Sequence, residues 1–136
     1  MDTSAGFREI EHTADWELHV WAPDLPGLFE QAARGMYALL KTGLQPGPRQ
    51  VRKIELSTAD REHLLVSFLS ELLWIGEKEG LAFDRFLLEV QGNSLIASVE
   101  GTPIGHQSKE IKAVTYHNLA IHRSDRGLEV NIVFDV

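Results

Sequence analysis

The feature that most constrains the fold is a segment near the middle of the chain with a broad apolar face. Its large apolar side chains recur at four-residue steps in two adjacent columns, the spacing of one face of an α-helix. They are Leu64, Leu65, Phe68, Leu69, Leu72 and Leu73. The pattern predicts the main core helix over about residues 58–79. Gly80 is placed to adopt the left-handed conformation that ends such a helix.

A second apolar stripe, earlier in the chain, predicts another helix. Asp24 is a good N-cap residue, and apolar side chains follow it at three- and four-residue steps until Gly43. The stripe consists of Leu25, Leu28, Phe29, Ala32, Met36, Leu39 and Leu40. We therefore expect a first helix over about residues 24–42.

The other apolar segments alternate with period two, as half-buried strands do. The expected strands are residues 16–22 and 50–56, a hairpin of 83–91 with 94–100, and a final hairpin of 111–122 with 128–136. Residues 101–106 are expected to form a loop. Strands grouped around two helices predict an α+β fold, with a largely antiparallel or mixed sheet packed against both helices. The length of 136 residues predicts a single domain, residues 1–136.

Composition argues against several classes of function. The formal net charge of −7 repels phosphate backbones and anionic membranes, so we expect no direct binding to nucleic acid or to a membrane. The absence of cysteine excludes disulfides, thiolate metal sites and thiol catalysis. Residues 1–6 lack the basic flank and apolar core of a signal peptide, and no apolar run approaches the ~18 residues that span a bilayer. A cytoplasmic location is therefore expected.

The ends of two predicted strands bring acidic residues near each other. If the final hairpin is regular about a turn at residues 124–127, Asp135 lies opposite Tyr116. Lys112 would then extend past the end of the partner strand by about 10 Å at strand spacing, close enough for its side chain to approach that end. Asp15 comes just before a strand begins, and Asp135 comes where a strand ends. In an antiparallel sheet these two positions can be neighbours.

Oxygen ligands in this position suit a hard divalent cation. The carboxylates of Asp15 and Asp135, with the backbone or carboxylate oxygen of Val136, match the preferences of Ca²⁺, Mg²⁺ and Mn²⁺. An aspartate at a strand end is more often a solvated or turn-capping residue, so the pattern alone leaves both interpretations open. His12 is similarly either a metal or acid/base group or, more commonly, a loop histidine that orients the turn before Asp15.

Known catalytic motifs do not occur in the sequence. There is no Walker-type phosphate loop, dinucleotide glycine fingerprint, helical His-Glu-x-x-His motif or Gly-x-Ser-x-Gly elbow. A metal-dependent hydrolase would need a general base beside the metal, and His12, His106 and His117 are the candidates. We rank this alternative last.

Three separated motifs resemble those of the archease family and follow one another in the same order. They are Ile10-Glu11-His12-Thr13-Ala14-Asp15, Glu110-Ile111-Lys112-Ala113-Val114-Thr115-Tyr116-His117-Asn118-Leu119 and Val133-Phe134-Asp135-Val136. The resemblance covers nearly the whole chain, because both predicted helices also fall where that family has them.

The resemblance implies a non-catalytic activator of the RtcB-type RNA-splicing ligase, a GTP-dependent enzyme. Archeases are expected to promote guanylylation of the ligase, to allow repeated turnover and to broaden its use of nucleotides. The resemblance also implies a divalent metal cofactor bound by Asp15, Asp135 and Val136. The residues that it assigns to function or to the partner are His12, Lys112, Tyr116 and His117.

Two departures from the family pattern accompany the resemblance. Asp15 is followed by Trp16-Glu17 where a small or aliphatic residue and glycine are usual, so the aromatic ring could change access to the metal. The loop of residues 101–109 is also shorter than usual. The second-ranked function is a general chaperone or assembly factor, which would be indifferent to changes at the metal ligands.

Overall fold

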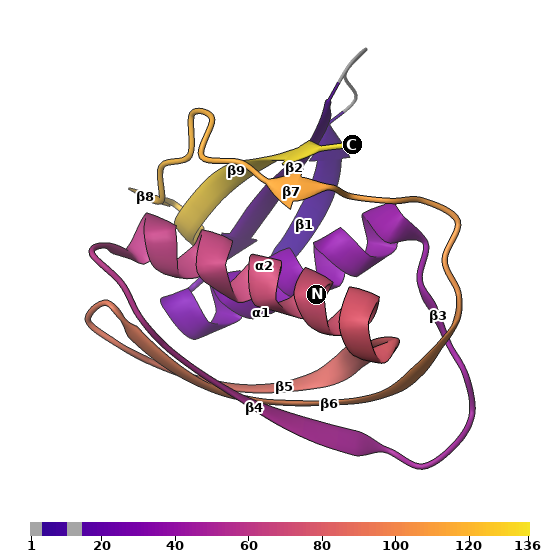
Figure 1. The fold of residues 1–136 in the computed structure, drawn as a ribbon. Coiled ribbons are helices and arrows are strands. Elements are labelled where there is room, and N and C mark those ends of the chain that lie inside the picture. The colour runs from indigo at the N-terminus through magenta and orange to yellow at the C-terminus, as the bar shows by residue number, and fades with distance from the viewer. Residues whose placement is uncertain (1–3, 11–14) are drawn as a thin grey trace.

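The computed structural model describes residues 4–10 and 15–136. In this part of the chain two helices lie between two antiparallel sheets, so the molecule has three layers (Figure 1). The helices are α1 (Leu25–Leu40) and α2 (Arg61–Glu79). The predicted α+β class with two main helices is confirmed. The division of the strands into two sheets was not predicted, because alternation identifies a strand and not its partner.

The first sheet is built around two long strands that pair along their whole length. Its strands are β1 (Gly6–Ile10), β2 (Trp16–Ala22), β9 (Gly127–Asp135), β7 (Ala113–Val114) and β8 (His122–Ser124). Strand β2 pairs with β9 from Trp16 opposite Phe134 to Ala22 opposite Leu128. The inward side chains of β2, Leu18 among them, are buried against α1, which confirms the predicted alternation.

The second sheet is organised by one long central strand. Its strands are β3 (Gly43–Leu44), β4 (Gln50–Ser57), β5 (Leu81–Gln91) and β6 (Ser94–His106). Strand β6 pairs with the other three. The loop predicted at residues 101–106 is wrong, because this segment continues β6 opposite Leu81–Phe83 and β3. Its glycines and Pro103 obscure the alternation, although they are compatible with close strand packing.

Helix α2 is the core helix that its apolar columns predict. It begins after Asp60, whose carboxylate accepts a hydrogen bond from the His63 amide at 2.7 Å, and ends at Gly80 with φ of 67°. Its Phe68 stacks on Phe29 of α1 with ring centroids 5.9 Å apart, and both rings are fully buried. Seven of its side chains are buried because the helix has sheet strands packed on both sides.

Helix α1 ends slightly earlier than predicted. Asp24 is its N-cap and accepts a hydrogen bond from the Gly27 amide at 2.8 Å. Its C-cap is Lys41 with φ of 55°, whereas Gly43, the predicted stop, already belongs to β3. Neither helix in residues 4–10 and 15–136 combines the length and apolar character that crossing a membrane requires.

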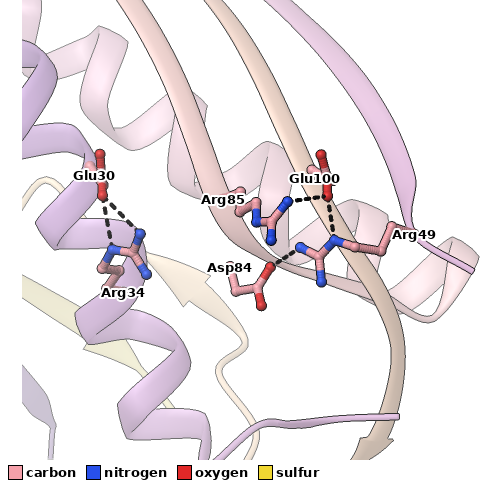
Figure 2. Close-up of polar contacts among 6 residues, drawn as sticks. All are labelled: Glu30, Arg34, Arg49, Asp84, Arg85 and Glu100. Atoms are coloured by element: carbon pink, nitrogen blue, oxygen red, sulfur yellow. Dashed lines mark hydrogen bonds and ion pairs between the residues drawn. The ribbon is translucent and has the colours of Figure 1, made fainter. Parts of the chain in front are cut away.

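Ion pairs join strands on the outer face of the second sheet (Figure 2). Arg49 donates to Asp84 and to Glu100, and Arg85 lies 3.2 Å from the same Glu100 carboxylate. The hydrogen bonds to Asp84 and Glu100 hold the pKa of Arg49 above its usual value. These exposed pairs fix the outer surface but contribute little to stability, because water screens them.

One glycine position in β6 makes the fold sensitive to a single methyl group. A Cβ atom at Gly101 would lie 1.8 Å from the Ala82 carbonyl oxygen, so the backbone of β5 would have to move. We predict that Gly101→Ala lowers the free energy of unfolding by about 3 kcal/mol. Urea unfolding would measure this. Gly76→Ala in α2 is the control, since a Cβ there meets nothing closer than 3.6 Å; equal effects of the two substitutions would contradict the prediction.

Candidate functional site

The first two candidate ligands lie at the same end of neighbouring strands. Asp15 directly precedes β2, and Asp135 is the last residue of β9. Because Trp16 is paired with Phe134, the two aspartates are one step beyond the last pair of this ladder. Both side chains are exposed. Strand pairing therefore places two aspartates that lie far apart in the sequence at the same end of the sheet.

Strand β7 brings Lys112 closer to Asp135 than the sequence predicted. Asp135 is paired with Ala113, and the Lys112 amide donates a hydrogen bond to the Asp135 carbonyl oxygen at 2.8 Å. The predicted register, with Asp135 opposite Tyr116, is wrong by three residues. Lys112 therefore lies directly beside the end of β9, with its side chain exposed. The offset of about 10 Å between Lys112 and the end of this strand, expected from a regular hairpin, is absent.

The change in register has a local cause. The turn at residues 124–127 and strand β8 follow the predicted hairpin, but the chain leaves the sheet over residues 116–121, after the bond from the Thr115 amide to the Val133 carbonyl oxygen. Helix α2 holds the end of this excursion, since Arg61 donates to the Ile121 carbonyl oxygen at 2.8 Å and Glu62 accepts from the Ile121 amide at 2.9 Å. Asn118, with φ of 52°, lies in the excursion. The sequence motif thus forms a short strand followed by an exposed loop.

This loop and the outer face of the first sheet enclose a polar groove of about 310 Å³. The groove is lined by Asp15, Glu17, His117, Asn118, Asn131 and Val133. The His117 amide donates to the Thr115 hydroxyl at 3.2 Å, and the Asn118 carboxamide lies 3.3 Å from the His117 ring. Two residues predicted to be functional, Asp15 and His117, therefore face one groove.

A hydrogen-bonded histidine supports one wall of the groove. The two ring nitrogens of His19 contact Glu129 at 2.8 Å and the Asn131 carboxamide oxygen at 2.5 Å. The His19 ring also lies 5.6 Å from that of Trp21, and the Arg126 guanidinium lies 4.3 Å from the centre of the Trp21 ring. His19 thereby orients Asn131, which lines the groove. Sequence reasoning missed Asn131, because only the pairing of β2 with β9 places it opposite His19.

The remaining candidates occupy different places. Tyr116 is about half exposed and its ring lies 5.0 Å from that of His63 on α2, so it packs on the helix and does not line the groove. His106 belongs to β6 and is paired with Gly43, in the second sheet. His12 lies outside the described residues. Of the two described histidines considered for a hydrolase, His106 and His117, only His117 lines the same groove as Asp15.

The donor atoms at this strand end suit a hard cation in type. Asp15, Asp135 and the main chain of Val136 offer oxygen, the ligand that Ca²⁺, Mg²⁺ and Mn²⁺ accept. Among residues 4–10 and 15–136, no three His, Asp or Glu side chains are grouped closely enough to hold a metal by themselves. Main-chain oxygens or water would therefore have to complete the coordination of an ion at this position.

Comparison with solved structures assigns the class of protein that this fold and site define. The solution structure of Methanobacterium thermoautotrophicum protein 1598 matches with a TM-score of 0.73 and 27% identity, over 96% of this chain and 99% of that one. The crystal structure of an archease from Thermotoga maritima, described as a possible chaperone, matches with a TM-score of 0.70 and 25% identity, over 95% and 96%. The chain is thus a small α+β protein of the archease type.

Sequence comparison gives the family itself. The model of the Archease protein family (MTH1598/TM1083) matches residues 7–136. The archease of Methanothermobacter thermautotrophicus is 28% identical over 96% of this chain and 99% of its own length. That of Thermococcus kodakarensis is 34% identical over 89% of this chain and 91% of its own length. This chain belongs to the archease family, as its three motifs predicted.

The ionisation of Glu129, which contacts His19 behind the polar groove, should make the stability of the fold depend on pH. A hydrogen bond from Ser124, together with His19 and Arg126, holds the pKa of Glu129 below its usual value. A lowered pKa stabilises the fold above the unfolded value near 4.3 and loses that contribution as the pH falls. We predict that Glu129→Gln is less stable than the wild type at neutral pH and that the difference shrinks as the pH falls through the lowered pKa of Glu129. Urea unfolding across this range tests it; a difference that does not vary with pH would contradict it.

Proposed function

We propose that this protein activates an RtcB-type RNA-splicing ligase, promoting its guanylylation and repeated turnover without catalysing a reaction itself. Membership of the archease family and the three motifs support the proposal. The observation that carries it is the convergence of the motifs on one strand end. Asp15 directly precedes β2, Asp135 ends the neighbouring β9, and the Lys112 amide is bonded to the Asp135 carbonyl oxygen. These residues come from the beginning, the late part and the end of the chain.

The residues of this end have separate roles in the proposal. Asp15, Asp135 and the main chain of Val136 would hold a divalent cation, which when bound lowers the charge penalty of nucleotidyl transfer to the ligase. The Lys112 amide fixes the backbone of Asp135. The exposed side-chain ammonium of Lys112 would supply a positive charge near the carboxylates. Tyr116, His117 and His12 would face the ligase. The protein contributes no nucleophile.

The charge of the chain suits a protein partner better than RNA. With a formal net charge of −7, long-range electrostatics repel an RNA backbone and favour a basic surface. An RNA ligase needs a basic groove for its substrate, so an acidic activator can approach it at the mouth of that groove. We therefore expect contact with the ligase and no direct contact with nucleic acid.

The test of the metal ligands is a guanylylation assay with the purified ligase and GTP. We predict that Asp15→Asn and Asp135→Asn abolish most of the stimulation and weaken divalent-ion binding in calorimetry, because each removes a charged oxygen ligand. Asp125→Asn, an identical change in the exposed turn before β9, is the control and should behave as the wild type. Full stimulation by both ligand variants would refute the metal-based mechanism.

The lysine can be tested without breaking the sheet. Lys112→Ala keeps the main-chain amide that bonds Asp135, so we predict normal folding with loss of most of the stimulation of the ligase. Lys109→Ala removes the same charge from the same segment and should change little. Thermal melting of both variants checks the fold. If the two alanine variants stimulate equally, the Lys112 side chain has no specific role.

The description of the Thermotoga maritima relative as a possible chaperone supports a second candidate function. A general chaperone would protect unrelated proteins from aggregation. Such protection should not depend on Asp15 or Asp135, because it requires apolar surface and not oxygen ligands. Measuring light scattering of a heated client protein with wild-type and Asp135→Asn forms separates the two functions. Equal protection by both forms, with no effect on the ligase, would favour the chaperone.

A further inference from the structure

A second hollow, separate from the polar groove, lies between the C-terminal halves of the two helices. It has a volume of about 430 Å³, within the range of pockets that bind ligands. Its apolar walls include Leu40 of α1, Leu72 and Leu73 of α2, Ile104 of β6 and Ile111. The segment of residues 107–112, which runs from β6 to β7 past the helices, borders it (Figure 1). We refer to this hollow as the helix pocket.

Gly76 lines the helix pocket, and the packing of the fold does not require a glycine at this position. It lies inside α2 and lines the pocket, although glycine is unfavourable within a helix because of its conformational entropy. A Cβ atom at this position would meet the Leu81 carbonyl oxygen at 3.6 Å and Ile104 at 3.8 Å, which are ordinary contacts. Packing therefore does not demand glycine here, and only a side chain longer than that of alanine would extend into the pocket.

Tyr37 lines the helix pocket, but its hydroxyl does not open into it. The hydroxyl oxygen is buried, near the main chain of Phe83. The exposed polar groups of the pocket lie at its border instead, on Glu77, Glu110 and Lys112. Apolar walls with a few polar groups are characteristic of a binding pocket.

The helix pocket adjoins the candidate site through one short segment. Lys112 lines the pocket with its side chain exposed, while its amide is bonded to Asp135 and the next residue, Ala113, is paired with Asp135. A partner that covers the end of β9 is therefore placed to cover the pocket as well. Trp74, which follows Leu73 on α2, is 52% exposed. Exposed tryptophan is typical of protein interfaces.

The charges around the helix pocket indicate the chemistry of the occupant. Glu77 and Glu110 are exposed at its border, with Lys112 as the cation there. We propose that the helix pocket receives an apolar side chain of the RNA ligase, flanked by a basic residue that pairs with Glu77. This inference rests on the proposed function, because it names the same partner. It adds a second point of contact, outside the metal ligands, that determines affinity.

Filling the helix pocket tests the inference with matched variants. Gly76→Met places a side chain in the pocket, and Gly76→Ala makes the same change of backbone with almost no filling. In calorimetric titrations with the purified ligase, Gly76→Met should weaken the Kd by about tenfold or more, while Gly76→Ala stays within about threefold of the wild type. Thermal melting of the two variants verifies that α2 is intact.

A charge reversal provides a test that does not touch the core. Glu77→Lys should weaken the Kd for the ligase by about tenfold at low salt and by less at high salt, because the pair with a basic residue is screened. Glu89→Lys, the same reversal at an exposed position of β5, is the control and should bind as the wild type. If Gly76→Met fails to fold, the comparison of Glu77→Lys with Glu89→Lys decides the question.

The outcomes separate this inference from the proposed function. Wild-type affinity in either Gly76→Met or Glu77→Lys would overturn the inference, and the proposed function would stand if Asp15→Asn still abolished stimulation. Failure of the wild-type protein to bind the ligase would overturn both. Self-association of the wild type that Gly76→Met abolishes, with unchanged affinity for the ligase, would assign the helix pocket to a second copy and also overturn the inference.

Discussion

The stacking of Phe29 on Phe68 lies at the centre of this protein. The two rings join α1 to α2 with centroids 5.9 Å apart, and both are fully buried between the sheets. Removing such a ring typically costs 3–5 kcal/mol, because a cavity replaces it. Two helices that are apolar on more than one side cannot be covered by a single sheet. The three-layer arrangement follows from this need, and each sheet then offers an outer face to solvent (Figure 1).

Strand β9 connects the buried core to the candidate site. Its buried residues, such as Phe134, hold it against the helices, and their neighbours in the chain consequently face outward. Asp135 is therefore presented at the surface by a rigid strand, with β2 on one side and β7 on the other. Asn131, on the same outward side, is fixed by His19. A site built on paired strands holds its geometry better than one on loops.

The segment of residues 107–121 connects the functional features of the molecule. One part of it borders the helix pocket, the middle forms β7 beside Asp135, and the last part carries His117 into the polar groove. Helix α2 anchors it at Ile121 through Arg61 and Glu62. A partner bound to this segment would contact all three features at once.

The sequence by itself determined both helices, the caps at Asp24 and Gly80, and the inward face of β2, because these follow from local periodicity and capping. Its motifs also predicted the archease family. Tertiary structure alone decided which strands pair, because alternation carries no information on partners. It extended β6 through Gly101, since that glycine accepts the close approach of Ala82. Tertiary structure also decided that Asp135 pairs with Ala113 and not with Tyr116. Contacts with α2 hold the intervening loop outside the sheet, so Lys112 lies beside Asp135.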